Sequence, residues 1–161
     1  MTPYGRSQLV LLMTRQTVWS TWQVRLFGTA CRDQNGIAGH DCVIDEPVNS
    51  GSQFPNLTIG GAGCKQAPCG PSGDAFRLSG TATVDLGGSL PNGTITGVGT
   101  FLHGECAPAV SPVQCVSPSA PRNANVFDFT ATPLLDSSGQ PAPLTVGQGR
   151  IIQFTVDISF S

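Results

Sequence analysis

The sequence RIIQFTVDISFS, residues 150–161, decides the fold class of this chain. Apolar residues occupy every second position of this stretch and alternate with polar ones: Ile152, Phe154, Val156, Ile158 and Phe160. A period of two places these side chains on one face of a β-strand, whereas a helix would spread them around its axis. Burial of each such side chain stabilises the folded state by roughly 1.5–3 kcal/mol. We therefore expect this strand to close a core that the earlier chain supplies.

Other stretches also predict β-strands, and none predicts a helix of ordinary length. The strongest is Phe76–Leu86, in which apolar and polar residues again alternate. Turn residues follow it, at Gly87-Gly88 and at Pro91-Asn92-Gly93. They predict that Thr94–Leu102 returns as the hairpin partner of Phe76–Leu86. Further short strands are expected at residues 17–27, 42–44, 57–59, 126–131 and 144–146.

These strands predict an all-β fold, an antiparallel β-sandwich of immunoglobulin-like or jelly-roll-like type with long disulfide-stapled loops. A length of 161 residues suits one domain. We expect residues 1–16 to form an N-terminal arm and residues 17–161 to form the single β-sandwich domain. Glycine and proline recur throughout residues 28–75, which predicts an irregular, loop-rich lobe there.

The composition excludes some functions. Charged residues make up 11% of the chain, against roughly 25% in typical soluble domains. A net charge of −2 offers no concentrated basic face, so nucleic acid is not an expected partner.

No apolar run approaches the roughly 20 residues of a membrane span. The apolar run Leu9–Met13 is too short for the core of a signal peptide, so we expect no such signal.

The six cysteines indicate an oxidising compartment. They fall into three close sets, Cys31 with Cys42, Cys64 with Cys69, and Cys106 with Cys115. Six cysteines allow 15 pairings. We favour the three local ones because each would staple a loop rich in glycine and proline. The alternative is six free thiols in a cytosolic protein.

Few residues suggest chemistry. A zinc site made of His40, Cys42, His103 and Cys106 has an acceptable set of ligands, but its spacing matches no zinc-finger or zinc-ribbon pattern, and each cysteine has a nearby disulfide partner instead. Asp45 and Glu46 are adjacent and would point apart on an extended segment, unlike the paired carboxylates of a glycosidase. We therefore expect no catalytic residues, no metal and no cofactor.

The N-terminal arm and the residues just after it carry the candidate interface residues. Arg6 and Arg15 have no acidic residue near them, and residues 1–32 carry +4 while the rest of the chain carries −6. This asymmetry suits docking of the arm on its own domain or on a neighbouring copy. With the apolar residues of the same region, the interface candidates are Arg6, Leu9, Leu11, Arg15 and Trp19.

The closing stretch also resembles the last strands of bacterial and phage immunoglobulin-like sandwiches, in which a Val-Gly-Gln turn precedes an alternating strand. Here the turn is Val146-Gly147-Gln148. The resemblance implies architecture alone.

These observations predict a non-enzymatic structural subunit of an extracellular assembly, such as a phage virion accessory protein that decorates a capsid or belongs to a tail. Its expected partners are copies of itself or other subunits, and its expected location is extracellular or on a virion surface. The alternative is a secreted β-sandwich binding module that recognises a glycan or a cell-surface protein. Exposed aromatic side chains would favour the module.

Overall fold

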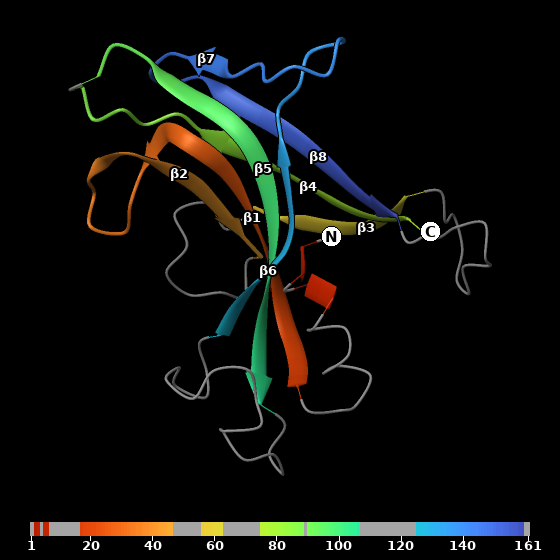
Figure 1. The fold of residues 1–161 in the computed structure, drawn as a ribbon. Coiled ribbons are helices and arrows are strands. Elements are labelled where there is room, and N and C mark those ends of the chain that lie inside the picture. The colour runs from red at the N-terminus through yellow and green to blue at the C-terminus, as the bar shows by residue number, and fades with distance from the viewer. Residues whose placement is uncertain are drawn as a thin grey trace.

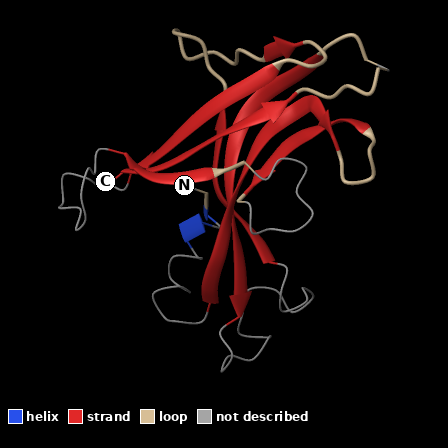
Figure 2. Cartoon of the chain, turned by 180° about the vertical axis from the view of Figure 1, so that it is seen from behind, coloured by secondary structure: helices blue, strands red, loops and turns tan. Residues whose placement is uncertain are grey.

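The computed structural model describes residues 2–3, 5–6, 17–46, 56–62, 75–88, 90–106 and 125–159. Within these ranges the chain forms eight strands in two antiparallel sheets, which confirms the prediction of an antiparallel all-β protein (Figure 1). The strands are β1 (Thr17–Arg32), β2 (Ala38–Asp45), β3 (Thr58–Ala62), β4 (Ala75–Thr83), β5 (Gly93–Cys106), β6 (Asn125–Pro133), β7 (Leu144–Val146) and β8 (Ile151–Ser159). Pro3, Gly5 and Arg6 lie in a short helical turn near the N-terminus (Figure 2). No helix in the described part of the chain is long and apolar enough to cross a membrane.

The larger sheet, sheet A, has the strand order β2-β1-β5-β6, with β7 pairing the start of β5. Its long strand β1 lies between β2 and β5, so that Val24 is opposite Ile44 on one side and Thr100 on the other. One face of β1 is apolar as the sequence predicts, because Val24 and Leu26 are buried and Trp22 packs against them.

The smaller sheet, sheet B, has the order β3-β4-β8. The predicted alternation of β8 is confirmed: Ile158 is buried, and Ile152, Phe154 and Val156 pack partly buried against the core. The residues between them are exposed up to Asp157. β8 is the last strand of the sheet and pairs with β4 alone among the described strands. Phe160 lies outside the described residues.

A single hydrophobic cluster contains residues of both sheets. Leu26 and Ile44 enter it from sheet A, and Leu78 and Ala82 enter it from sheet B, all of them almost completely buried. The alternating apolar residues of β1, β2 and β4 therefore share one core.

The predicted hairpin between residues 76–86 and 94–102 is wrong. β4 belongs to sheet B, where it pairs with β3 and β8, whereas β5 belongs to sheet A, where it pairs with β1, β6 and β7. The segment between β4 and β5 therefore carries the chain from one sheet to the other (Figure 1). Turn residues indicate where the chain changes direction, but the partner of the next strand is decided by long-range pairing.

Strands β1, β2, β5 and β6 of sheet A are all longer than the sequence predicts. β1 continues past Phe27 to Arg32, and β2 runs from Ala38 to Asp45 instead of covering only residues 42–44. An irregularity at Gly28 separates the two halves of β1. Gly28 has a φ of 145°, a β-carbon at this position would overlap the backbone oxygen of Thr94, and its N–H donates to the Asp41 carboxylate at 2.8 Å. Only glycine fits this position without displacement of the neighbouring strand.

Candidate functional site

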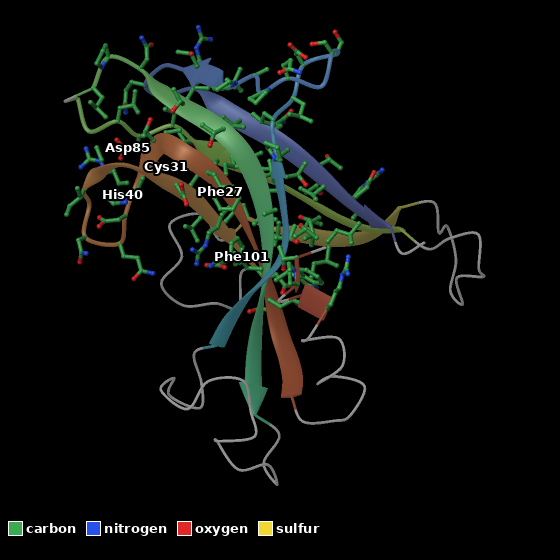
Figure 3. All side chains as sticks on the ribbon, viewed as in Figure 1. Phe27, Cys31, His40, Asp85 and Phe101 are labelled. Atoms are coloured by element: carbon green, nitrogen blue, oxygen red, sulfur yellow. A yellow bond between two sulfur atoms is a disulfide. The ribbon has the colours of Figure 1, made fainter. Side chains whose placement is uncertain are left out.

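Three turns meet around Asp85, which lies just after β4 (Figure 3). Asp85 Oδ2 lies 2.9 Å from Arg32 Nε at the end of β1, and this ion pair joins the two sheets. The N–H of Arg32 Nε is not aligned as a hydrogen bond in this contact. Arg32 Nη1 donates instead to the backbone oxygen of Gly36 in the β1–β2 turn, at 2.9 Å.

Gln148 brings the turn between β7 and β8 into the same cluster. Its Oε1 accepts the N–H of Leu86 at 2.5 Å, and its Nε2 lies 3.4 Å from Asp85 Oδ1. Asp85 Oδ1 also accepts the N–H of Gly87 at 3.0 Å. The Gly87 N–H, followed by Arg32, holds the pKa of Asp85 below its usual range. We name Arg32, Asp85 and Gln148 the Asp85 cluster.

Two other aspartates build five-residue turns of matching geometry. Asp33 Oδ1 accepts the N–H of Asn35 at 2.9 Å and that of Ile37 at 2.7 Å. Asp136 Oδ1 accepts the N–H of Ser138 at 2.8 Å and that of Gln140 at 3.0 Å. These bonds stabilise the ionised carboxylates and lower their pKa values, through Ile37 above all for Asp33 and through the Ser138 side chain above all for Asp136.

The Asp85 cluster and the aspartate turns hold chain segments together and do not assemble an acid, a base and a nucleophile. Their carboxylates accept backbone N–H groups or pair with arginine, which is the chemistry of turn and sheet stabilisation. His40 Nε2 lies 4.0 Å from Asp33 Oδ2 at an exposed position. Among the described residues no group of three or more histidine, cysteine, aspartate or glutamate side chains could hold a metal ion.

The Cys31–Cys42 disulfide is confirmed. It links β1, where Cys31 lies (Figure 3), to β2 with a Cα–Cα distance of 5.0 Å, and both cysteines are fully buried. Cys42 is therefore not available as a zinc ligand. Nor does the zinc site considered from the sequence assemble, because His40 lies opposite Cys31 whereas His103 lies opposite Thr21. These positions are ten residues apart along β1, on the order of 30 Å.

The outer face of sheet A, opposite the core, carries a row of polar and aromatic side chains. Gln23 Nε2 donates to Asp45 Oδ1 at 2.9 Å, and Arg25 Nε donates to Gln23 Oε1 at 2.6 Å. The guanidinium of Arg25 lies over the ring of Phe101, 4.4 Å from its centroid. Phe101 in turn contacts Phe27 edge to face, with a centroid distance of 6.3 Å (Figure 3). We name these five residues the β1 outer row.

The β1 outer row is closely packed. Gln23 and Asp45 are 4% and 5% exposed although they lie on the face away from the core. Phe27 occupies the space above Gly99, where a β-carbon would come within 2.5 Å of its ring. The row therefore fills a cross-strand surface with satisfied partners, as aromatic and polar pairs do when they stabilise a sheet.

Few of the site residues expected from the sequence can be placed. Arg6 lies exposed in the N-terminal helical turn, where its N–H donates to the carbonyl of Thr2 at 3.2 Å. The backbone of Trp19 pairs with that of Gly104 within sheet A. The other interface candidates, Leu9, Leu11 and Arg15, lie outside the described residues, as do Cys64, Cys69 and Cys115. Cys106 ends β5, and its predicted pairing stays a prediction.

Neither the Asp85 cluster nor the β1 outer row was predicted from the sequence. The two aspartate turns could have been predicted from the sequence, because they share a pattern of residue types. Aspartate comes first, a small polar residue third and glycine fourth, in residues 33–36 and again in residues 136–139. Arg32 and Asp85 carry no such signal, because they are far apart in the sequence and meet only when the two sheets pack.

No protein-family model matches the chain, and neither a curated protein nor a solved structure is significantly similar to it.

Proposed function

We propose that this chain is a non-enzymatic structural subunit of an extracellular protein assembly, such as a phage virion accessory protein that decorates a capsid or belongs to a tail. One observation carries the proposal: large apolar side chains are exposed in or beside the turns. Ile37 and Leu90 are 58% and 40% exposed, and Leu135, Leu144 and Ile151 are 51%, 49% and 69% exposed. Contiguous exposed apolar surface is typical of sites of protein–protein contact.

The positions of these residues support a common docking region. Ile37, Leu90 and Leu135 lie in connections between strands, and Leu144 and Ile151 are the first residues of β7 and β8. The connections that precede β5, β7 and β8 lie together at the upper end of Figure 1. Leu90 also approaches the β1–β2 hairpin, where a β-carbon at Gly39 would lie 3.9 Å from its side chain.

The Asp85 cluster would make this region rigid. Contacts among Arg32, Asp85 and Gln148 connect three turns. A pre-organised surface loses less entropy when it docks. We also propose that the two sheets pack as a β-sandwich of immunoglobulin-like or jelly-roll-like type, which the shared core cluster supports and which would place these turns at one end of the sandwich.

The alternative is a secreted module that binds a glycan. The Phe27–Phe101 pair favours it, because partly exposed aromatic rings can stack on sugars. The guanidinium of Arg25 lies over Phe101, however, and the Phe27 ring packs above Gly99. These contacts occupy the ring surfaces that a sugar would need, so we favour the structural subunit.

The proposal is tested by measuring where the native protein sediments in extracts of the cells that produce it and in their culture fluid. An antibody raised against the purified chain would be used to locate it in a density gradient. We expect the protein to co-sediment with large particles. Recovery only at the top of the gradient, as free protein, would overturn the proposal.

A matched pair of variants tests the docking region. Leu135→Glu and Leu144→Glu together place two charges beside the turns, whereas Ile59→Glu changes a residue that is 40% exposed on β3, away from the turn region. We expect the double variant to fold, as judged by circular dichroism, and to lose co-sedimentation, and we expect Ile59→Glu to retain it. Equal co-sedimentation of the two variants would rule out the turn region as the docking surface.

A further inference from the structure

The outer edge of β8 has the features of a strand that pairs with another strand. β8 contains nine residues, pairs with β4 without a bulge from Ile151 to Ser159, and is the last strand of sheet B among the described strands. Monomeric proteins commonly protect such an edge with lysine, proline or a bulge. β8 contains none of these, and its one charged residue, Asp157, is engaged by Arg77 of β4 through contacts of 2.7 Å.

The register shows which backbone groups face that edge. Val84, which directly follows β4, donates to the carbonyl of Arg150 at 2.8 Å and accepts the N–H of Gly149 at 2.9 Å, so the backbone groups of Val84 and of the even-numbered residues of β4 point toward β8. Hydrogen-bonded pairs alternate along an antiparallel ladder. The even-numbered residues of β8 therefore bond to β4, and the odd-numbered residues direct their N–H and C=O groups outward. Thr155 is the central residue of this outward set.

The apolar face of β8 is incompletely covered. Leu78 and Ala82 on β4 are at most 1% exposed, whereas Ile152, Phe154 and Val156 on β8 keep part of their surface accessible. The exposed remainder follows the edge of sheet B, where a further strand would cover it.

We propose that β8 pairs antiparallel with β8 of a second copy of this chain, about a two-fold axis at Thr155. Overlap of the full strand then places Phe154 opposite Val156 and Ile152 opposite Ile158, so that apolar residues meet on the core face. On the outer face Gln153 lies opposite Asp157, and no two like charges are opposed. The two copies of sheet B become one continuous six-stranded sheet, an isologous contact of the kind that closes a dimer.

The alternating sequence of β8 makes this register self-complementary. A two-fold axis at Asp157 would set two carboxylates directly against each other, which is unfavourable. An axis at Gln153 would leave the last residues of β8 without a partner strand. The axis at Thr155 avoids both and uses every outward backbone group of the strand.

The inference rests on the proposed function in one respect, because it names a partner for a subunit, but the two are tested separately. Co-sedimentation with particles tests the proposed function. Sedimentation equilibrium of the purified full-length chain tests the dimer, which has about 33 kDa, twice the 16.7 kDa of one chain. A monomer across the accessible concentration range would overturn the β8 pairing and leave the proposed function standing.

Thr155→Pro removes the outward N–H at the two-fold axis and leaves the bonds to β4 in place, because proline is tolerated on edge strands where its nitrogen faces solvent. We expect this variant to retain the circular dichroism spectrum of the parent and to dimerise about tenfold more weakly or worse. Dimerisation as strong as that of the parent would place the contact elsewhere and refute the proposal.

Cross-linking tests the register and does not depend on the folding of the proline variant. A hydrogen-bonded antiparallel pair has a Cα–Cα distance of about 5.5 Å, within the range of a disulfide. We expect Thr155→Cys to form a covalent dimer on mild oxidation. Thr58→Cys is the matched control, since it changes an exposed threonine on β3, the other outer strand of sheet B. Cross-linking of both variants alike, or of neither, would refute the two-fold axis at Thr155.

Discussion

Replacement of Gly28 by alanine should be among the most destabilising conservative changes in this chain. The φ of 145° is one that L residues rarely adopt, and a residue forced into such a region costs about 1–3 kcal/mol. The added β-carbon would also overlap the backbone oxygen of Thr94 on β5, and overpacking against a neighbouring strand costs about 1–3 kcal/mol more. We expect a loss of about 4 kcal/mol in the free energy of unfolding, which lowers the melting temperature by about 8–16 °C in a chain of this size.

Gly36→Ala is the matched control. Gly36 also has a positive φ, of 80°, but no atom lies within 4 Å of the position that a β-carbon would take. It should therefore lose about 1–2 kcal/mol, through backbone strain alone. Urea denaturation of both variants with the disulfide intact, followed by tryptophan fluorescence, measures the difference. A loss in Gly28→Ala no larger than that in Gly36→Ala would refute the steric argument at the β1 irregularity.

Three further outcomes are expected. Phe154→Ala should cost about 2–3 kcal/mol because the ring packs half-buried on the core, whereas Thr155→Ala on the exposed face should cost well under 1 kcal/mol; equal shifts of the urea midpoint would contradict the face assignment. Replacement of both Cys31 and Cys42 by alanine should cost about 2–4 kcal/mol, measured in the same assay against the oxidised parent. Because the pKa of Asp136 is lowered in the folded state, its ionised carboxylate stabilises the protein above the ordinary aspartate pKa of about 3.9, and this stabilisation is lost as the pH falls below that value. Asp136→Asn removes the titrating group. We therefore expect the melting temperature of this variant, measured from pH 6 to pH 2, to fall less steeply with decreasing pH than that of the parent.

The local patterns of the sequence predicted the strands well. The alternation in β8 and β4 placed Ile158 and Leu78 on the core side, and the spacing of Cys31 and Cys42 predicted their bridge. Such patterns succeed because the side-chain period of a strand depends only on neighbours along the chain.

Long-range pairing could not be predicted in the same way. The turn residues around Gly87 correctly indicate a change of direction, but β5 joins sheet A instead of returning along β4. The Arg32–Asp85 ion pair and the Arg25–Phe101 contact follow from that crossing and from the β1–β5 register. Neither the register nor the sheet order can be predicted from one segment of the sequence alone. The Asp85 cluster and the β1 outer row are therefore evident only in the folded chain.

The sheet order also has a consequence for how the chain folds. β1 and β2 are close in sequence and can pair early, but Thr17 must find Cys106 and Ala75 must find Ser159. Such distant pairings make loop closure entropically costly, and we expect folding in the range of milliseconds to seconds. During synthesis on the ribosome β4 can pair with β3 early, but its pairing with β8 has to wait, so sheet B cannot be completed until Ser159 has left the exit tunnel.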